Sequence, residues 1–527
     1  REQLLRDFRE YQVTAVREGE TGSIRSYILP PQDDQPGVDR LASLLVQQGV
    51  EVGRAESGFS ACGSDYPRDS VVIDLAQPAK RLIRTLMDSQ VSMPEDFLAE
   101  QERLQSKGLP DVIYDVTAWS LPLMFNVRAD ACEQSVVVDT QAVDAAPVPG
   151  KVEGGQASVA YLVPWGNGPA IRFLSAALQS GLVVNSADSA FTIDDREFPG
   201  GSLILPVLDN PDDLHARVSA LAEETGARVV TMDTSWVTEG PSFGSGNVVR
   251  MSPPRVAIAW DEPTRPYSAG NARFVIERQF DYPVTAIRTA DLADADLMHY
   301  QVLVLPETDD EDYLAVLGEN GRNNLRDWVE RGGVLLTLGN ATRLVADPPA
   351  KLLAIQREYA AAPTVDNSET APGDAAVVPG THLDEASYSE TIRPREVDPE
   401  SLGGALLRAR VDPDHWLGAG VASELNVLAR GSDIYTPIRL DLGVNVARFA
   451  SADDLLASGY VWKANRAQLA YKPFVVVQPL GAGFIIAFTQ DPTVRAYLDG
   501  LNTLFMNAVF RAAAHARPVT RGAVLSE

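Results

Sequence analysis

The stretch that decides the fold is residues 332–345, GGVLLTLGNATRLV. Its apolar run predicts a buried strand, and the residues at 339–341 predict a tight turn into a helix. In an open α/β sheet, ligands or chemistry usually lie at such a strand-to-helix turn. Hydrolases of this general shape present an exposed nucleophile there, whereas this chain places Asn340 at the turn. The sequence therefore predicts a turn of catalytic shape that lacks a nucleophile.

The segments around this turn predict a doubly wound parallel sheet over residues 253–520. Helical segments alternate with strand-like runs, the pattern of a parallel sheet with helices on both faces. Those runs lie at 255–260, 284–288, 301–306, 334–339, 472–480 and 483–489. Residues 360–400 are rich in Ala, Pro, Asp and Ser and indicate a long surface excursion, which we expect to span about 360–430. A final helix is expected from about 491 to 514.

Two similar stretches precede this domain. YPRDSVVI at 66–73 matches FPGGSLIL at 198–205, and the offset of 132 residues also places Gly49 on Gly181. A constant offset over this distance indicates a duplicated unit. We therefore expect two tandem α/β repeat units, at 22–145 and 157–252, after an N-terminal helical segment at 1–21. The apolar, aromatic run at 114–127 predicts a core helix that docks one unit on the next.

Composition limits the classes of function. At 527 residues the chain suggests about three domains. The formal net charge of −27 argues against nucleic acid and against anionic membranes as partners. No apolar run reaches the ~18 residues that a membrane span needs. The two cysteines, Cys62 and Cys132, either form one disulfide in an oxidising compartment or remain buried thiols. Because the sequence opens at Arg1, we expect a processed product or part of a longer protein.

Two motifs resemble metal sites. The HLDE run from His382 to Glu385 matches two ligands of an HxxE zinc site but lacks a distant third ligand, so a surface loop is favoured. PETDDEDY at 306–313 follows a strand and could hold calcium or magnesium, although such runs are more often solvated loops. We assign no metal ligand and no catalytic residue.

Four polar residues near strand ends are the candidates for ligand binding: Asp261, Asn340, Asp491 and Arg495. Asp491, which Pro492 follows, also fits the N-cap of the final helix. Arg495, one turn further, could pair with Asp491 or with a ligand.

The order of several motifs resembles a known family. YILPP (27–31), YDVTAW (114–119), YLVP (161–164) and the final GFIIAFTQDPTVRAY (483–497) are similar to the C-terminal region of large bacterial zinc carboxypeptidases of the carboxypeptidase A-like family. In that family a zinc peptidase domain precedes modules of this kind, and the last domain is similar to class I glutamine amidotransferases. The resemblance implies a periplasmic or secreted protein.

The zinc peptidase domain has no counterpart in this sequence, and Asn340 and Ala341 stand where an amidotransferase would have its cysteine. The resemblance thus implies a non-catalytic part or subunit of a secreted zinc metallocarboxypeptidase, which supports, shapes or oligomerises the peptidase domain. No cofactor is expected on this chain, and zinc is expected in the parent's peptidase domain. The expected partners are that domain and further copies of the chain, without nucleic acid or membrane insertion.

Two alternatives remain open. The third domain could be an atypical hydrolase that uses Thr342, Asp261 or Asp491 near the edge of the sheet. The chain could instead be a binding module for peptide or carbohydrate, with Tyr161 and Trp165 as exposed contacts between the repeats.

Overall fold

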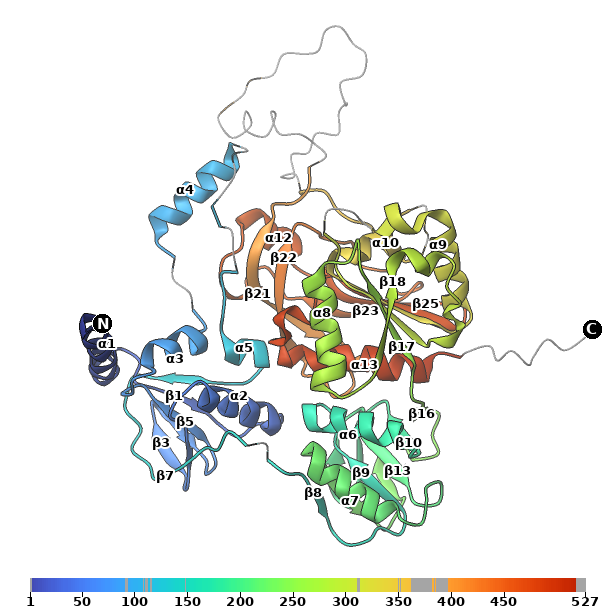
Figure 1. Cartoon of the computed structure of the whole chain (residues 1–527), viewed down its shortest axis with the longest axis horizontal. Helices are drawn as coiled ribbons and strands as arrows, with labels where there is room; N and C mark the ends of the chain where they lie inside the picture. Colours follow the sequence, from blue (N-terminus) through green and yellow to red (C-terminus); the bar gives the residue numbers. More distant parts are fainter. Residues whose placement is uncertain are drawn as a thin grey trace, which may run out of the picture.

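The computed structural model describes residues 2–517 except 91–92, 108, 110–111, 114–115, 147, 310–312, 349, 351, 362–381, 383 and 385–396. Three α/β units follow one another along the chain (Figure 1). A first helix, α1 (Glu2–Thr21), is exposed over its first half and packs on the first unit through its second half. Gly19 permits this contact, because a Cβ there would lie 1.9 Å from the carbonyl oxygen of Leu75.

The first unit is a five-stranded sheet in the order β6-β1-β5-β2-β7. Its strands are β1 (Ser26–Leu29), β2 (Gly53–Ala55), β5 (Val71–Asp74), β6 (Asp130–Cys132) and β7 (Thr140–Ala142), with a hairpin of β3 (Phe59–Ala61) and β4 (Ser64–Tyr66). Its helices are α2 (Gln35–Gln47), α3 (Lys80–Met87), α4 (Glu95–Ser106) and α5 (Leu121–Phe125). Cys62 and Cys132 form a disulfide that ties the hairpin region to β6.

The second unit is a six-stranded sheet in the order β16-β10-β13-β9-β14-β8. Its strands are β8 (Lys151–Glu153), β9 (Ala160–Val163), β10 (Val184–Ala187), β13 (Leu203–Pro206), β14 (Arg228–Met232) and β16 (Val248–Met251). A small sheet of β11 (Phe191–Ile193), β12 (Arg196–Phe198) and β15 (Val237–Glu239) joins it, with helices α6 (Gly168–Gln179) and α7 (Leu214–Thr225). Asn167 caps α6 by accepting a hydrogen bond from the amide of Ala170 at 3.0 Å.

The first two units share an order of elements. In each, the strand before the first helix pairs antiparallel with a later strand, which also pairs antiparallel with the strand after that helix. The resulting orders are β1-β5-β2 and β9-β13-β10. Strands β3 and β11 start 132 residues apart, and so do β5 and β13. The correspondence covers the segments in which the sequence motifs match.

The third unit is built on a ten-stranded mixed sheet. Five parallel strands come first, in the order β18 (Val284–Arg288), β17 (Val256–Trp260), β19 (Val302–Leu305), β20 (Val334–Leu338) and β26 (Gly483–Phe488). Antiparallel strands β25 (Pro473–Leu480), β23 (Val444–Phe449), β21 (Leu402–Val411), β22 (Glu424–Gly431) and β24 (Leu456–Ser458) extend it. One face packs on α8 (Pro266–Phe274) and α13 (Asp499–His515), and the other on α9 (Tyr313–Glu330).

The excursion predicted over about 360–430 is wrong in its second half. Residues 402–431 contribute β21 and β22, whose side chains are mostly buried, so this stretch belongs to the sheet. Much of the first half lies outside the described residues.

The predicted core helix at 114–127 is also wrong in extent and in partner. Among the described residues of this run, only Leu121–Phe125 is helical, and the helix ends where Asn126 adopts a left-handed conformation with φ of 55°. The described part of the run docks on the third unit rather than on the second. The Thr117 hydroxyl donates to the carbonyl of Gly404 at 2.7 Å, and the Asn126 amide donates to the carbonyl of Glu424 at 3.0 Å.

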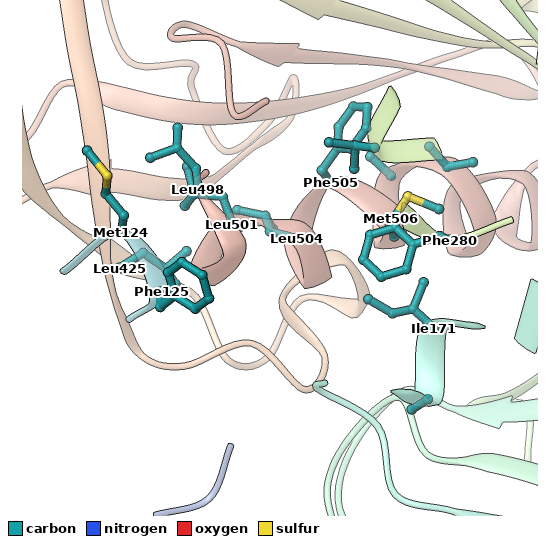
Figure 2. Packing of buried hydrophobic residues seen from close by; sticks show 14 of the residues in the cluster. Met124, Phe125, Ile171, Phe280, Leu425, Leu498, Leu501, Leu504, Phe505 and Met506 are labelled. Atoms are coloured by element: carbon teal, nitrogen blue, oxygen red, sulfur yellow. The ribbon is translucent and has the colours of Figure 1, made fainter. Parts of the chain in front are cut away.

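Helix α13 is the element on which the other two units dock. Figure 2 shows Met124 and Phe125 of α5 near Leu498 and Leu501 at one end of α13, and Ile171 of α6 near Met506 further along. Polar contacts secure the same interface, since Trp165 donates its indole N–H to the amide oxygen of Asn507 at 2.9 Å. None of the described helices combines the length and the apolar composition that a membrane span needs.

Candidate functional site

A concave site lies where the parallel strands of the third unit end. A cavity of about 870 Å³ is lined by residues that follow β19, β20 and β26, the edge at which open α/β sheets bind ligands. Three of the four residues predicted to bind a ligand line it: Asn340, Asp491 and Arg495.

The turn after β20 has the predicted strand-to-helix geometry. Residues Gly339–Ala341 form a 3-10 turn between β20 and the short helix α10 (Thr342–Ala346). Gly339 has φ of 54°, and a Cβ there would lie 2.3 Å from the carboxylate of Glu307. Only glycine therefore fits this turn, both for its backbone conformation and for the approach of Glu307.

Asn340 is held by the neighbouring loop. Its side-chain oxygen accepts from the amide of Thr308 at 2.8 Å, and its side-chain N–H donates to the carbonyl of the same residue at 3.0 Å. Asn340 thus fixes the loop after β19, which carries Glu307 into the cavity. Thr342, the alternative hydroxyl at this turn, is fully buried and lies 3.0 Å from the hydroxyl of Thr337.

Asp491 is a buried hydrogen-bond acceptor and not the N-cap that was predicted. One carboxylate oxygen accepts from the amide and the hydroxyl of Thr493 at 2.8 and 2.6 Å, and the other accepts from the hydroxyl of Ser268 at 2.6 Å. Helix α13 begins only at Asp499, because Arg495 and Ala496 both have positive φ and interrupt the chain.

Glu307 is the most perturbed acid of the cavity. Its side chain is 12% exposed and lies 3.2 Å from Arg430 and 3.7 Å from Arg265. Burial raises the pKa of Glu307 to about 7, and the neighbouring Asp491 carboxylate adds to the shift, while the two arginines oppose it. A carboxyl group that titrates near neutrality in a cleft marks a candidate functional site.

Among the described residues, four arginines and three carboxylates line the cavity, although the chain as a whole carries an excess of acids. Arg343 pairs with Asp433 through two contacts of 2.8 Å. Arg495 differs from the other three. Its guanidinium lies 4.7 Å from the centre of the Trp119 ring, and no carboxylate among the described residues is within ion-pair distance of it. The cavity therefore has a cation available for an anion.

Asp261, the fourth predicted residue, lies outside this cavity. It follows β17 in a left-handed conformation with φ of 77°, and its half-exposed side chain pairs with Arg288 at 3.3 Å. Asp261 therefore does not share a site with the other three, because the turn directs this side chain to the surface.

Tyr161 and Trp165 were predicted as exposed contacts, and both are buried. The Tyr161 hydroxyl lies 3.0 Å from Nδ1 of His215, and Trp165 lies in the interface with α13. Neither side chain is therefore an exposed contact.

The two motifs that resemble metal sites gain no support. His382 is described but Glu385 lies outside the described residues, as do residues 310–312 of the acidic run. In the part of the chain that the structure describes, no group of three or more His, Cys, Asp or Glu side chains could hold a metal ion.

Sequence reasoning missed the arginines that complete the cavity. Arg430 lies at the end of a strand that was assigned to the excursion, and Arg343 lies only three residues after Asn340. The position of Arg343, one helical turn after a predicted site, is the signal that could have found it.

Comparisons with known proteins give only distant structural similarities. No protein-family model matches the chain, and no curated protein matches it significantly. Among solved structures, a ThuA-like protein from Parabacteroides merdae is 12% identical over 51% of this chain and 92% of its own, with a TM-score of 0.33. A glutamine amidotransferase from Thermotoga maritima is 9% identical over 49% and 98%, with a TM-score of 0.31. A β-galactosidase from Bacillus circulans is 12% identical over 51% and 32%, with a TM-score of 0.29. Nothing in these comparisons indicates a relationship with zinc carboxypeptidases.

Proposed function

We propose that this chain is a non-catalytic binding module whose third unit holds a small anionic ligand in the cavity at the carboxyl edge of its sheet. One observation carries the proposal. Arg495 lines the cavity with its guanidinium on the ring of Trp119, and no carboxylate of the described residues pairs with it. A guanidinium held on an aromatic face is well suited to bind a carboxylate or phosphate, because its orientation is fixed in advance.

The surroundings favour an anion over a cation or a neutral ligand. The carboxylates of the cavity are already engaged, since Asp433 pairs with Arg343 and Asp491 accepts three hydrogen bonds. A volume of about 870 Å³ lies within the range of small-molecule sites.

The contacts at the turn argue for binding without covalent catalysis. A nucleophile needs a base within reach. The residues that line the cavity in the described part of the chain include no histidine and no cysteine. The carboxylate that accepts from the Ser268 hydroxyl, Asp491, is buried and already accepts two hydrogen bonds from Thr493. Asn340, at the place of the nucleophile, is bonded to Thr308 through both of its polar atoms.

Isothermal titration with citrate and with inorganic phosphate tests the proposal. We expect saturable binding of at least one of them that weakens as NaCl is added, because salt screens charge pairs near the surface. Arg495→Gln should weaken it by about 10-fold or more, the effect of losing charge-assisted hydrogen bonds. Arg439→Gln is the matched control, since Arg439 is exposed and pairs with Asp441 in a loop outside the cavity. Absence of binding at millimolar ligand, or equal affinity of the Arg495→Gln variant, would refute the proposal.

The association with a zinc carboxypeptidase domain stays a prediction. It is supported by the order of sequence motifs, and the Cys62–Cys132 disulfide supports the oxidising compartment that such a partner would share. We also infer, from the shared strand order and the 132-residue offset, that the first two units are copies of one ancestral unit. A co-purifying chain with an HxxE motif that supplies zinc-dependent removal of C-terminal residues would support the association, and peptide cleavage by this chain alone would overturn the non-catalytic role.

A further inference from the structure

A second cavity adjoins the anion site. It has a volume of about 530 Å³ and lies between α3, α4 and the described residues of the 112–119 segment. Ile113 and Val116 line both cavities. Trp119 lines the second cavity, and Arg495 lines the first. The guanidinium of Arg495 stacks on the ring of Trp119. The two spaces therefore meet at a wall to which Ile113 and Val116 contribute apolar side chains, with a cation at its edge.

The second cavity is mainly apolar where it meets this wall. Phe97, Val112 and Trp119 line it together with the two shared residues. Its charged members, Arg84 and Asp88, satisfy each other through contacts of 2.8 and 3.0 Å. An uncharged alkyl chain could enter this cavity without leaving a buried charge unpaired, because Arg84 and Asp88 already pair with each other.

We propose that the ligand of the anion site is an amphiphilic carboxylate, whose head binds Arg495 and whose alkyl chain crosses Ile113 and Val116 into the second cavity. The inference rests on the proposed function and adds the chemical class of the ligand. A small polar anion would leave the second cavity unused, whereas a chain of several carbon atoms would remove the apolar wall from water. That burial is the main source of affinity for apolar ligands.

The chain-length series acetate, butanoate, hexanoate and octanoate tests this inference by isothermal titration. Each methylene buried should tighten Kd by about threefold to fourfold, the factor for transfer from water. From butanoate to octanoate the gain is about 100-fold if the whole chain enters. 1-Octanol, which lacks the charge, should bind at least about 10-fold more weakly than octanoate. An affinity independent of chain length would overturn the inference.

Variants separate the head from the chain. Arg495→Gln should weaken all of the carboxylates by a similar factor and leave the slope with chain length intact. Phe97→Ala should flatten that slope, and its matched control is Phe274→Ala, at a half-exposed phenylalanine outside both cavities. Val112→Ser changes an exposed position of the second cavity and should also flatten the slope with chain length. It provides a second test if Phe97→Ala fails to fold. An unchanged slope in Val112→Ser would overturn the path proposed for the chain.

The results distinguish this inference from the proposal on which it rests. If citrate or phosphate binds and depends on Arg495 but the carboxylates show no slope, the anion site stands and the amphiphile is refuted. If neither the small anions nor the carboxylates bind, both are refuted.

Discussion

At the scale of single residues, the candidate site is organised around Glu307. Gly339 leaves space for its carboxylate, and Asn340 fixes the loop that carries it. Arg430 and Arg265 lie close to it, yet burial still favours its neutral form. The charge of the cavity therefore depends on pH, and the arginines are least opposed when Glu307 is protonated.

Glu307 should make stability depend on pH in a defined direction. Its pKa is about 7 in the folded state, against the ordinary glutamate value of 4.5 in an unfolded chain, so the folded protein binds more protons between these values. Its contribution to stability is therefore complete below pH 4.5 and is lost as pH rises through 7. The difference in unfolding free energy between wild type and Glu307→Gln should fall by about 3 kcal/mol over this window. Urea unfolding at several pH values measures it, and a difference that is flat with pH would contradict the assignment.

The sequence predicted part of the site at this scale. Asn340, Asp491 and Arg495 follow strands that end at one edge of the sheet, and they do meet there. Asp261 also follows such a strand, but its left-handed backbone directs the side chain away from the cavity. The sequence does not reveal this backbone conformation. Ser268 and Arg430 were missed because their roles depend on contacts more than a hundred residues away along the chain.

At the scale of elements, α13 joins the units through buried polar contacts as well as apolar packing. Arg511 is 1% exposed and pairs with Asp188 of the second unit at 2.5 Å. It also donates to the carbonyl of Trp416 at 3.0 Å and to the hydroxyl of Ser186. Burial lowers the pKa of Arg511 to about 10, while the Asp188 carboxylate opposes the shift.

Asp188→Asn should destabilise the protein strongly. The substitution leaves the buried guanidinium of Arg511 without its counter-charge, which costs about 3 kcal/mol or more. Asp213→Asn breaks the exposed pair with Arg217 on α7 and should cost less than about 1 kcal/mol. Chemical unfolding followed by circular dichroism compares the two. Equal, small losses would show that the Arg511 contact does not hold the second unit in place.

Sequence patterns predicted elements better than their partners. The apolar runs at the parallel strands are long and continuous, so these strands were found. Strands β21 and β22 were missed because the polar stretch before them suggested that the excursion continued. Helix α13 was predicted too early because Asp491 and Pro492 resemble a helix start, whereas Asp491 serves Thr493 and Ser268 instead.

At the scale of the whole molecule, an acidic protein surrounds a cavity rich in arginine. The chain carries a formal charge of −27, yet the described lining of the cavity holds four arginines and three carboxylates. A uniformly acidic surface would repel small anions, so this local reversal of charge is where an anion could bind. The first unit also contributes, because Trp119 supports Arg495 from outside the third unit. The cavity is therefore complete only when the first unit is docked.

The most direct test of the central claim is to locate an anion in crystals of the full chain. Selenate has the shape and charge of sulfate, and its selenium gives an anomalous signal that marks its position. We predict a peak in the cavity within hydrogen-bond distance of the Arg495 guanidinium, and its loss in crystals of Arg495→Gln. Selenate peaks confined to other parts of the surface, with none near Arg495, would contradict the account.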